Sequence, residues 1–282
     1  MLATTGNSQR VFQLVMLTIL VLGALLMVGP LLYMVGTSLR GDVFALETPP
    51  IFFPENPTLR NFERALASRN FLQAGLNSLF VAVCTSFFVV LLSSMMAYAF
   101  ARFQFRAKQA IFYTLLAMMM VPTMMLIIPQ FIFAKNLGLI NTLPSLIVVY
   151  VSGGLAGNTF LLRGFFEALP RELEESALID GANHWVIYSR IILPLSKPAL
   201  STVAVFSFLG AWDEYIWALT SVGSNELART LPIAVANFRG VHTSNWGLIF
   251  AGAVIQVVPS ILIFLFFQRY FVQGLTQGAV RG

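Results

Sequence analysis

The sequence predicts an all-α integral membrane protein with six transmembrane helices and a helix-turn-helix outside the membrane. Hydrophobic residues make up 57% of its 282 positions and charged residues only 10%, whereas soluble domains carry roughly 25% charged residues. The mean hydropathy is +0.80. Six stretches that lack Asp, Glu, Lys and Arg divide the chain, and one strongly charged stretch lies between the fourth and the fifth. This composition excludes a disordered chain and indicates that lipid surrounds much of it.

The uncharged stretches have the length of helices that cross the hydrocarbon core, which takes about 20 residues. They cover residues 11–39, 70–101, 109–134, 136–162, 198–212 and 240–268. The fifth is short, but apolar residues continue beyond Asp213 and Glu214, so we expect the fifth helix over about 199–220. The first is much longer than the 7–15-residue apolar region of a cleaved signal peptide, and we interpret it as a membrane helix.

Prolines and glycines indicate where these helices bend or approach one another. The prolines within or beside the stretches are Pro30, Pro122, Pro129, Pro144 and Pro259. Because proline lacks a backbone N–H group, we expect kinked or interrupted helices at these positions. Gly153 and Gly157 form a G-x-x-x-G pattern, which predicts close packing against another helix.

The basic residues predict which side of the membrane holds the termini. An even number of crossings places both ends of the chain on the same side, and most of the 17 Lys and Arg residues then lie on that side, including the basic turn at 102–108. Lys and Arg favour the cytoplasmic side. We therefore expect cytoplasmic termini, an N-terminal helix and first outer loop over 1–70, a transmembrane core over 71–270, and a cytoplasmic tail over 271–282.

The most polar stretch of the chain covers 163–198, between the fourth and fifth predicted helices. Its charged residues are Arg163, Glu167, Arg171, Glu172, Glu174, Glu175, Asp180, Arg190 and Lys197. This density of charge does not belong in lipid. Pro170 and the acids that follow it favour the start of a helix, and Gly181 can end that helix in a left-handed conformation. A second short helix over about 183–192 completes a predicted helix-turn-helix.

Part of this stretch has the spacing of a known motif. Glu175, Ser176 and Ala177 are followed by Gly181 after three residues, by Ile191 after nine more, and then by Leu193 and Pro194. This pattern resembles the EAA loop of ABC importer permeases, from which only Ser176 departs. Because serine is small, it keeps the close approach that alanine would give.

The resemblance implies a cytoplasmic coupling loop within the fold of a type I ABC importer permease. Its short helix would dock in a groove on an ATPase subunit and carry the closing motion of that subunit into the membrane helices. The residues expected to form this loop are Glu175, Ser176, Ala177, Asp180, Gly181, Ile191, Leu193 and Pro194. The role needs a rigid helix, a tight turn at Gly181, and a carboxylate at Glu175 that meets a basic residue of the partner.

Other segments are similar to the carbohydrate branch of the family, which includes the maltose permease (MalG-like) proteins. They are FQRYFVQGLTQGAVRG at the C-terminus, GAWDEYIWAL in the fifth helix, and TLPIAVANF followed by NWG before the sixth. The resemblance implies one half of a translocation path for a sugar or sugar derivative in a bacterial or archaeal cytoplasmic membrane. It also implies that the outer loop over 221–246 meets a binding protein and that the tail over 273–282 reaches between the ATPase subunits.

The implied partners are a homologous second permease, two ABC ATPase subunits, an extracytoplasmic solute-binding protein, the sugar and membrane lipid, but no nucleic acid. The chain lacks the G-x-x-x-x-G-K-[ST] phosphate loop, so we expect ATP and Mg to be bound by the ATPase subunits. His184 and His242 are isolated, and Cys84 is the only cysteine. We therefore expect no metal site, no internal disulfide and no enzyme activity in this chain.

Aromatic and polar residues in the predicted helices are candidates for the substrate path or gate. They are Asn77, Asn158, Trp212, Asp213, Tyr215 and Trp217. Aromatic faces and carboxylates suit hydroxylated ligands. The alternative places the aromatic residues in the belt at the membrane interface and makes the asparagines bridges between helices.

Two other functions remain open. A permease for peptides, polyamines or amino acids would share the EAA loop but not the carbohydrate-type tail. An ion-coupled secondary transporter is supported only by an intramembrane carboxylate such as Asp213.

Overall fold

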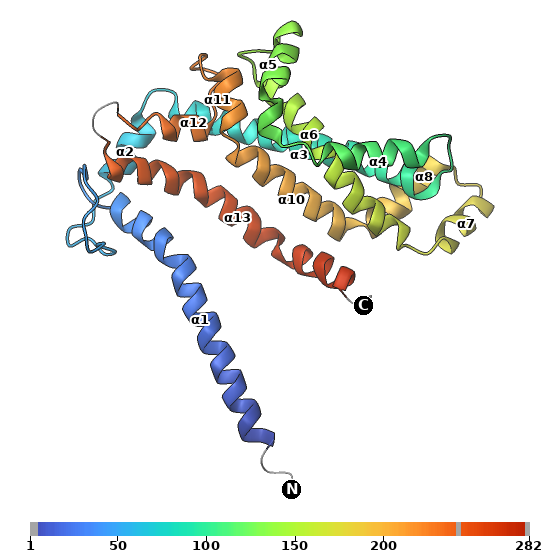
Figure 1. The fold of residues 1–282 in the computed structure, drawn as a ribbon, viewed down its shortest axis with the longest axis horizontal. Helices are drawn as coiled ribbons and strands as arrows, with labels where there is room; N and C mark the ends of the chain where they lie inside the picture. The colour runs from blue at the N-terminus through green and yellow to red at the C-terminus, as the bar shows by residue number, and fades with distance from the viewer. Residues whose placement is uncertain (1–4, 241–243, 280–282) are drawn as a thin grey trace. The chain divides into compact units, whose positions relative to one another are not determined.

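The computed structural model describes residues 5–240 and 244–279, and all regular elements in those ranges are helices (Figure 1). In chain order they are α1 (Thr5–Ser38), α2 (Arg60–Ala67), α3 (Phe71–Arg102), α4 (Lys108–Met118), the 3-10 helix η1 (Thr123–Leu126), α5 (Ile127–Asn136), α6 (Leu143–Glu167), α7 (Glu172–Ile179), α8 (His184–Ile187), the π-helix η2 (Tyr188–Ile192), α9 (Leu193–Leu195), α10 (Lys197–Asp213), α11 (Ile216–Val222), α12 (Leu231–Ala236) and α13 (Trp246–Ala279). The predicted all-α class is confirmed.

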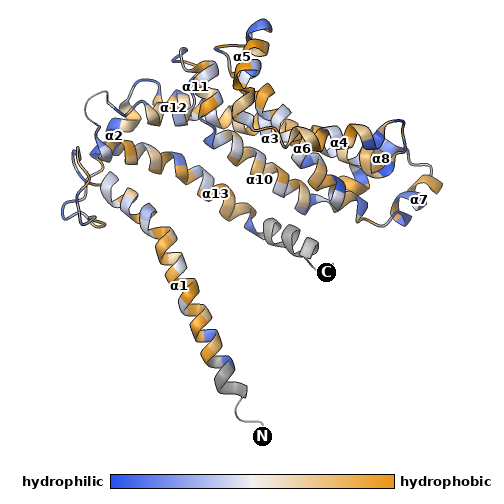
Figure 2. Ribbon diagram, viewed as in Figure 1, coloured by the Kyte–Doolittle hydropathy of each residue, from blue (hydrophilic) through white to orange (hydrophobic). Residues whose placement is uncertain are grey.

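Four helices in the described ranges are long and apolar enough to cross a membrane, namely α1, α3, α6 and α13. Two bent pairs also qualify when each is counted as one crossing, which gives up to six and agrees with the predicted number. The first pair joins α4 to η1 and α5 with a bend of 95°, and the second joins the segment His184–Leu195 to α10 with a bend of 79°. Hydrophobic residues dominate the long helices (Figure 2).

The helix expected over 109–134 is interrupted in the structure. α4 ends at Met118, and Pro122 adopts an extended conformation (φ −60°, ψ 126°) before η1 begins. Proline cannot donate the backbone hydrogen bond that would continue the helix. The segment therefore turns sharply at Pro122, one of the prolines at which a kinked or interrupted helix is predicted.

The helix expected over 199–220 is also divided, because α10 ends at Asp213 and α11 begins at Ile216. Glu214 is extended (ψ 127°), and its carboxylate accepts hydrogen bonds from the backbone N–H groups of Trp217 (2.8 Å) and Ala218 (3.0 Å). The first N–H groups of a helix have no partner within it, and a carboxylate there is favourable. Glu214 thus stabilises the start of α11.

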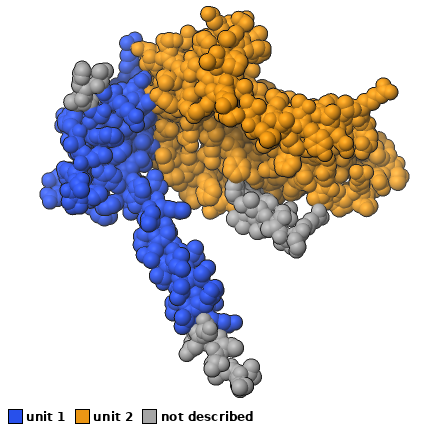
Figure 3. All heavy atoms as spheres, viewed as in Figure 1, with its two compact units in different colours: residues 1–69, 235–255 blue, residues 70–234, 256–282 orange. Residues whose placement is uncertain are grey.

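The chain forms two compact units (Figure 3): residues 1–69 with 235–255, and residues 70–234 with 256–282. In the first unit, the Asn61 side-chain amide donates to the carbonyls of Ser38 (3.1 Å) and Arg40 (2.6 Å). The N–H group of Trp246 donates to the carbonyl of Val43 (2.7 Å). These bonds hold the loop after α1 against α2 and the start of α13.

In the second unit, α3 packs along α6 and α10. Many of the buried side chains on α3 are small, among them Ser93, Ser94 and Ala97, and small residues let helices approach closely. A Cβ atom placed on Gly154 of α6 would lie 3.1 Å from Val89 Cγ2 on α3. A Cβ atom on Gly153 would meet no described atom within 4 Å. Gly154 therefore makes the close contact with α3. Of the predicted pair, Gly157 lies close to the end of α4, because a Cβ atom there would be 3.2 Å from Met119 Cε.

Candidate functional site

The charged stretch forms a helical hairpin, α7 to α9, with Gly181 at its turn. Gly181 has a φ of +84°, a region that favours glycine. The N–H of Ala182 donates to the carbonyl of Ala177 (2.9 Å), and the N–H of Gly181 donates to that of Leu178 (3.0 Å). These two bonds form a Schellman motif, which satisfies carbonyls at the end of α7. The left-handed helix end predicted at Gly181 is confirmed.

The second half of the hairpin starts at Asn183, whose side-chain oxygen accepts a hydrogen bond from the N–H of Val186 (2.9 Å). α8 then continues through the π-helix η2 into α9. Ile191 lies in η2 and Leu193 begins α9, and both are half-buried against the core of the second unit. Pro194 is exposed near the start of α9, where its missing N–H group costs little.

The outer surface of the hairpin combines acids with exposed apolar side chains. Glu175, Ser176 and Asp180 are exposed, while Ala177 is half-buried against the core. The exposed apolar residues are Leu173, Leu178, Ile179 (87% exposed) and Trp185 (61% exposed). Large apolar residues in a charged surface are typical of a binding surface for another protein.

Glu174 was not among the predicted site residues, yet it is the buried residue of α7. It forms an ion pair with Arg102 at the end of α3, and the Tyr98 hydroxyl donates to its other oxygen (3.3 Å). Arg102 also donates to the carbonyl of Leu169, which precedes α7 (3.1 Å). A buried charge is normally paired in this way. The contacts of Glu174 with Arg102 and Tyr98 therefore attach α7 to α3.

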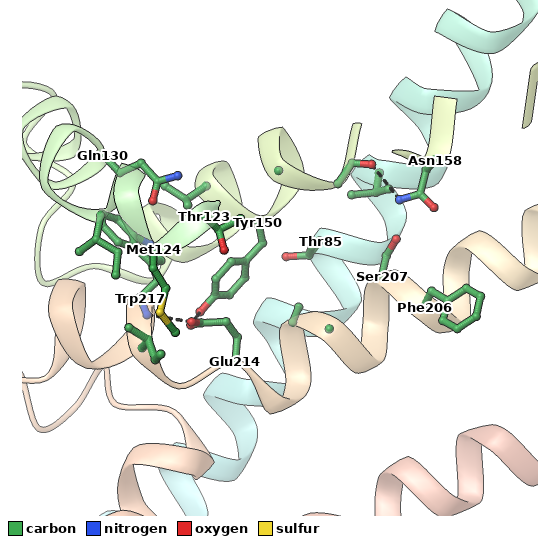
Figure 4. Close-up of a pocket in the computed structure, with 18 residues that line it drawn as sticks. Thr85, Thr123, Met124, Gln130, Tyr150, Asn158, Phe206, Ser207, Glu214 and Trp217 are labelled. Carbon is green, nitrogen blue, oxygen red and sulfur yellow. Dashed lines mark hydrogen bonds between the residues drawn. The ribbon is translucent and has the colours of Figure 1, made fainter. Parts of the chain in front are cut away.

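A second candidate site is a cavity of about 470 Å³ between α3, the η1–α5 segment, α6, α10 and α11 (Figure 4). Its polar lining residues are Thr85, Thr123, Gln130, Tyr150, Asn158, Ser207 and Glu214. Among the described atoms, the hydroxyl groups of Thr85 and Ser207 are buried and have no hydrogen-bond partner. Unpaired buried hydroxyls are unfavourable, so a polar ligand that entered the cavity and reached these two groups would relieve that cost.

One wall of the cavity is formed by Tyr150, Glu214 and Trp217. The Tyr150 hydroxyl donates to Glu214 (2.5 Å), and the indole N–H of Trp217 donates to the carbonyl of Ser145 (3.3 Å). Trp217 is buried. These bonds fix an aromatic ring and a carboxylate on the cavity wall, an arrangement suited to orienting a hydroxylated ligand.

The other predicted path residues lie in several environments. Asn158 lines the cavity and donates to the carbonyl of Gly154 (2.8 Å). The remaining four are not among its lining residues. Asn77 is buried and donates to the carbonyls of Leu227 and Arg229 (both 2.8 Å), and it thereby joins α3 to the loop after α11.

The other three lie at or after the end of α10. Trp212 is buried, stacks on Phe208, and donates to the carbonyl of Gln256 (3.0 Å). Asp213 is exposed and accepts from the Gln256 side chain (3.3 Å), and Tyr215 is exposed. His242 in the predicted outer loop and residues 280–282 of the predicted tail lie outside the described residues.

Residues 89–277 match the protein family described as the binding-protein-dependent transport system inner membrane component. The chain belongs to this family. This inner membrane component is 32% identical to the diacetylchitobiose uptake system permease protein NgcG of Streptomyces coelicolor, over 98% of this chain and 91% of that protein. It is 35% identical to the trehalose/maltose transport system permease protein MalG of Thermococcus litoralis, over 94% and 96% of the two chains.

The fold of this inner membrane component is also found in solved structures. A chain of a bacterial ABC transporter involved in the import of alginate superposes with a TM-score of 0.82. The match covers 94% of this chain and 98% of that one, at 23% sequence identity. The predicted permease fold is thereby confirmed.

Proposed function

We propose that this chain is the permease subunit of an ATP-driven importer and forms half of the path for a sugar or sugar derivative across the cytoplasmic membrane. The observation that carries the proposal is the α7–α9 hairpin, which presents Glu175, Ile179 and Trp185 outward around the fixed turn at Gly181. Such a surface suits docking on a separate motor subunit. The chain itself has no phosphate loop.

The assembly we propose contains a homologous second permease, two ABC ATPase subunits that bind ATP and Mg, and an extracytoplasmic solute-binding protein. Both termini and the hairpin lie on the cytoplasmic side. ATP-driven closure of the ATPase subunits moves the hairpin and shifts the membrane helices between inward-facing and outward-facing states. This chain catalyses no bond change and transmits motion.

The sugar class rests on relatives and on the cavity. Besides NgcG and MalG, the similar curated proteins include an arabinooligosaccharides permease, AraQ of Halalkalibacterium halodurans, at 33% identity. In the cavity, the unpaired hydroxyls of Thr85 and Ser207 and the ring of Trp217 match a ligand that has both hydroxyl groups and apolar ring faces.

Uptake by the complete complex in proteoliposomes tests this proposal. The complex is supplied with labelled disaccharides, a dipeptide or a polyamine, with ATP inside the vesicles and binding protein outside. We expect accumulation of a sugar that requires ATP and stops when the ATPase subunits carry an inactivating substitution. Accumulation of only the dipeptide or polyamine would overturn the sugar class, and uptake driven by an ion gradient without ATP would overturn the importer class.

A further inference from the structure

Both halves of the hairpin make polar contacts with one membrane helix, α3. In the first half, Glu174 pairs with Arg102 and accepts from Tyr98. In the second half, the Tyr188 hydroxyl lies 2.7 Å from the Ser94 hydroxyl, and its ring lies 5.4 Å from that of Tyr98. The hairpin is thus attached to the last turns of α3 at two points.

The attachment of α7 depends on charge more than on apolar packing. Its large apolar residues Leu173, Leu178 and Ile179 are exposed, and Glu174 is the residue of α7 that is buried. The side chains of Arg102 and Glu174 are only 7% and 10% exposed. A hydrogen-bonded ion pair has a defined direction and geometry, whereas an apolar contact can slide. The pair therefore resists displacement of α7 along α3.

A second ion pair near the hairpin provides a contrast. Arg163 and Glu167 are 2.8 Å apart, four residues apart on α6, with side chains 25% and 44% exposed. The two charges of this pair lie within one helix and near solvent, so the ion pair itself contributes little, although Arg163 also lies over the Phe112 ring of α4 at 4.0 Å. The Arg102–Glu174 pair differs in joining two elements in a buried position.

We propose that Arg102 and Glu174 are positioning residues that make α7 and the end of α3 move as one body when the ATPase subunits close. The inference rests on the proposed function. α3 also carries Thr85 and Val89, which line the cavity. Thr85 lies 17 positions before Arg102 on the same helix, about 25 Å at 1.5 Å per residue. The pair therefore connects the hairpin to the cavity through one continuous helix.

Coupling of ATP hydrolysis to uptake tests the pair in the complete complex. Glu174→Gln keeps the shape of the side chain but leaves Arg102 without its counter-charge, and Glu167→Gln is the matched control. We expect Glu174→Gln to lower the amount of solute transported per ATP hydrolysed by about tenfold, while the control keeps the wild-type ratio. A purely structural role would lower complex yield and reduce uptake and hydrolysis in proportion.

A wild-type ratio for Glu174→Gln, or a proportional loss of both activities, overturns the inference while leaving the proposed function intact. Absence of ATP-driven uptake by the wild-type complex overturns the proposed function, and the inference with it. The two failures are therefore distinguishable.

A distance measurement covers the case in which Glu174→Gln does not assemble. Spin labels at Leu92→Cys on α3 and Glu172→Cys on α7, in a Cys84→Ser background and with cysteine-free partner subunits, report the separation of the two elements. Both positions are exposed, and neither is in the proposed docking surface. We expect the same distance with and without ATP. A shift of the distance distribution on ATP binding would show that α7 and α3 move separately and would overturn the inference.

Discussion

The Tyr150 hydroxyl donates a hydrogen bond to Glu214, whose carboxylate also accepts from the first N–H groups of α11. A tyrosine on α6 thereby fixes a charged residue at the break between α10 and α11. The same two side chains line the cavity. The break in the helix and the wall of the proposed sugar path thus share one carboxylate, that of Glu214.

Tyr150→Phe removes this contact without removing the ring. We expect a loss of about 1 kcal/mol in stability, because one oxygen of the half-buried Glu214 carboxylate loses its donor. We also expect a raised KM for uptake. Thermal unfolding of the purified complex and initial uptake rates measure the two effects, with Tyr215→Phe, a tyrosine outside the cavity lining, as the control. Equal effects in the two variants would count against a role for Tyr150 in the cavity.

Thr85→Val and Ser207→Ala remove hydroxyl groups that have no partner among the described atoms. Because an unpaired buried hydroxyl is unfavourable, we expect unchanged or slightly higher thermal stability. Loss of a ligand contact predicts a KM for sugar raised by roughly fivefold, equivalent to about 1 kcal/mol. If both variants transport with wild-type KM, the hydroxyls do not contact the sugar.

Glu175→Lys reverses a charge on the exposed face of the hairpin. We expect normal folding, since the side chain is exposed, together with uptake reduced by at least about tenfold, since like charges at an interface cost several kcal/mol. Glu172→Lys, an exposed acid outside the EAA pattern, is the control. Comparison of uptake with complex yield separates docking from folding, and wild-type uptake by Glu175→Lys would argue against docking through this carboxylate.

Gly181→Val tests the turn of the hairpin. A Cβ atom at Gly181 meets nothing within 4 Å, so any penalty comes from the backbone, where φ is +84°. A β-branched residue in this region costs about 1–2 kcal/mol. Gly181→Asn should lose less, because asparagine tolerates the left-handed conformation. Thermal unfolding ranks the variants, and a valine variant as stable as the asparagine variant would contradict the assigned turn.

Local patterns in the sequence were sufficient for part of this structure. The apolar stretches predicted the long helices, and the acids followed by Gly181 predicted α7 and its turn. Each of these signals is contained within one helix. The pattern of apolar residues predicts the helix, and the left-handed conformation that glycine adopts predicts where the helix ends.

The rest of the structure depends on contacts between residues that are distant in the sequence. Glu174 is one of several acids in its stretch, and it is distinguished by Arg102 and Tyr98, which lie 72 and 76 positions earlier. Glu214 ends a predicted span because its carboxylate meets the N–H groups of α11 and a tyrosine 64 positions away. Hydropathy is averaged over a window of residues that are neighbours in the sequence, so it does not detect contacts between residues that are distant in the sequence. Thr85 and Ser207 likewise acquire their significance only when α3 and α10 are brought together.

The central claim is that the hairpin receives force from a separate ATPase on the cytoplasmic side. A photo-crosslinking amino acid at Ile179, which is 87% exposed on α7, tests it most directly in intact cells. We predict a crosslink to a subunit that mass spectrometry identifies as an ABC ATPase. Crosslinks only to extracytoplasmic proteins, or labelling of an Ile179→Cys variant by a membrane-impermeant thiol reagent applied from outside, would contradict the account.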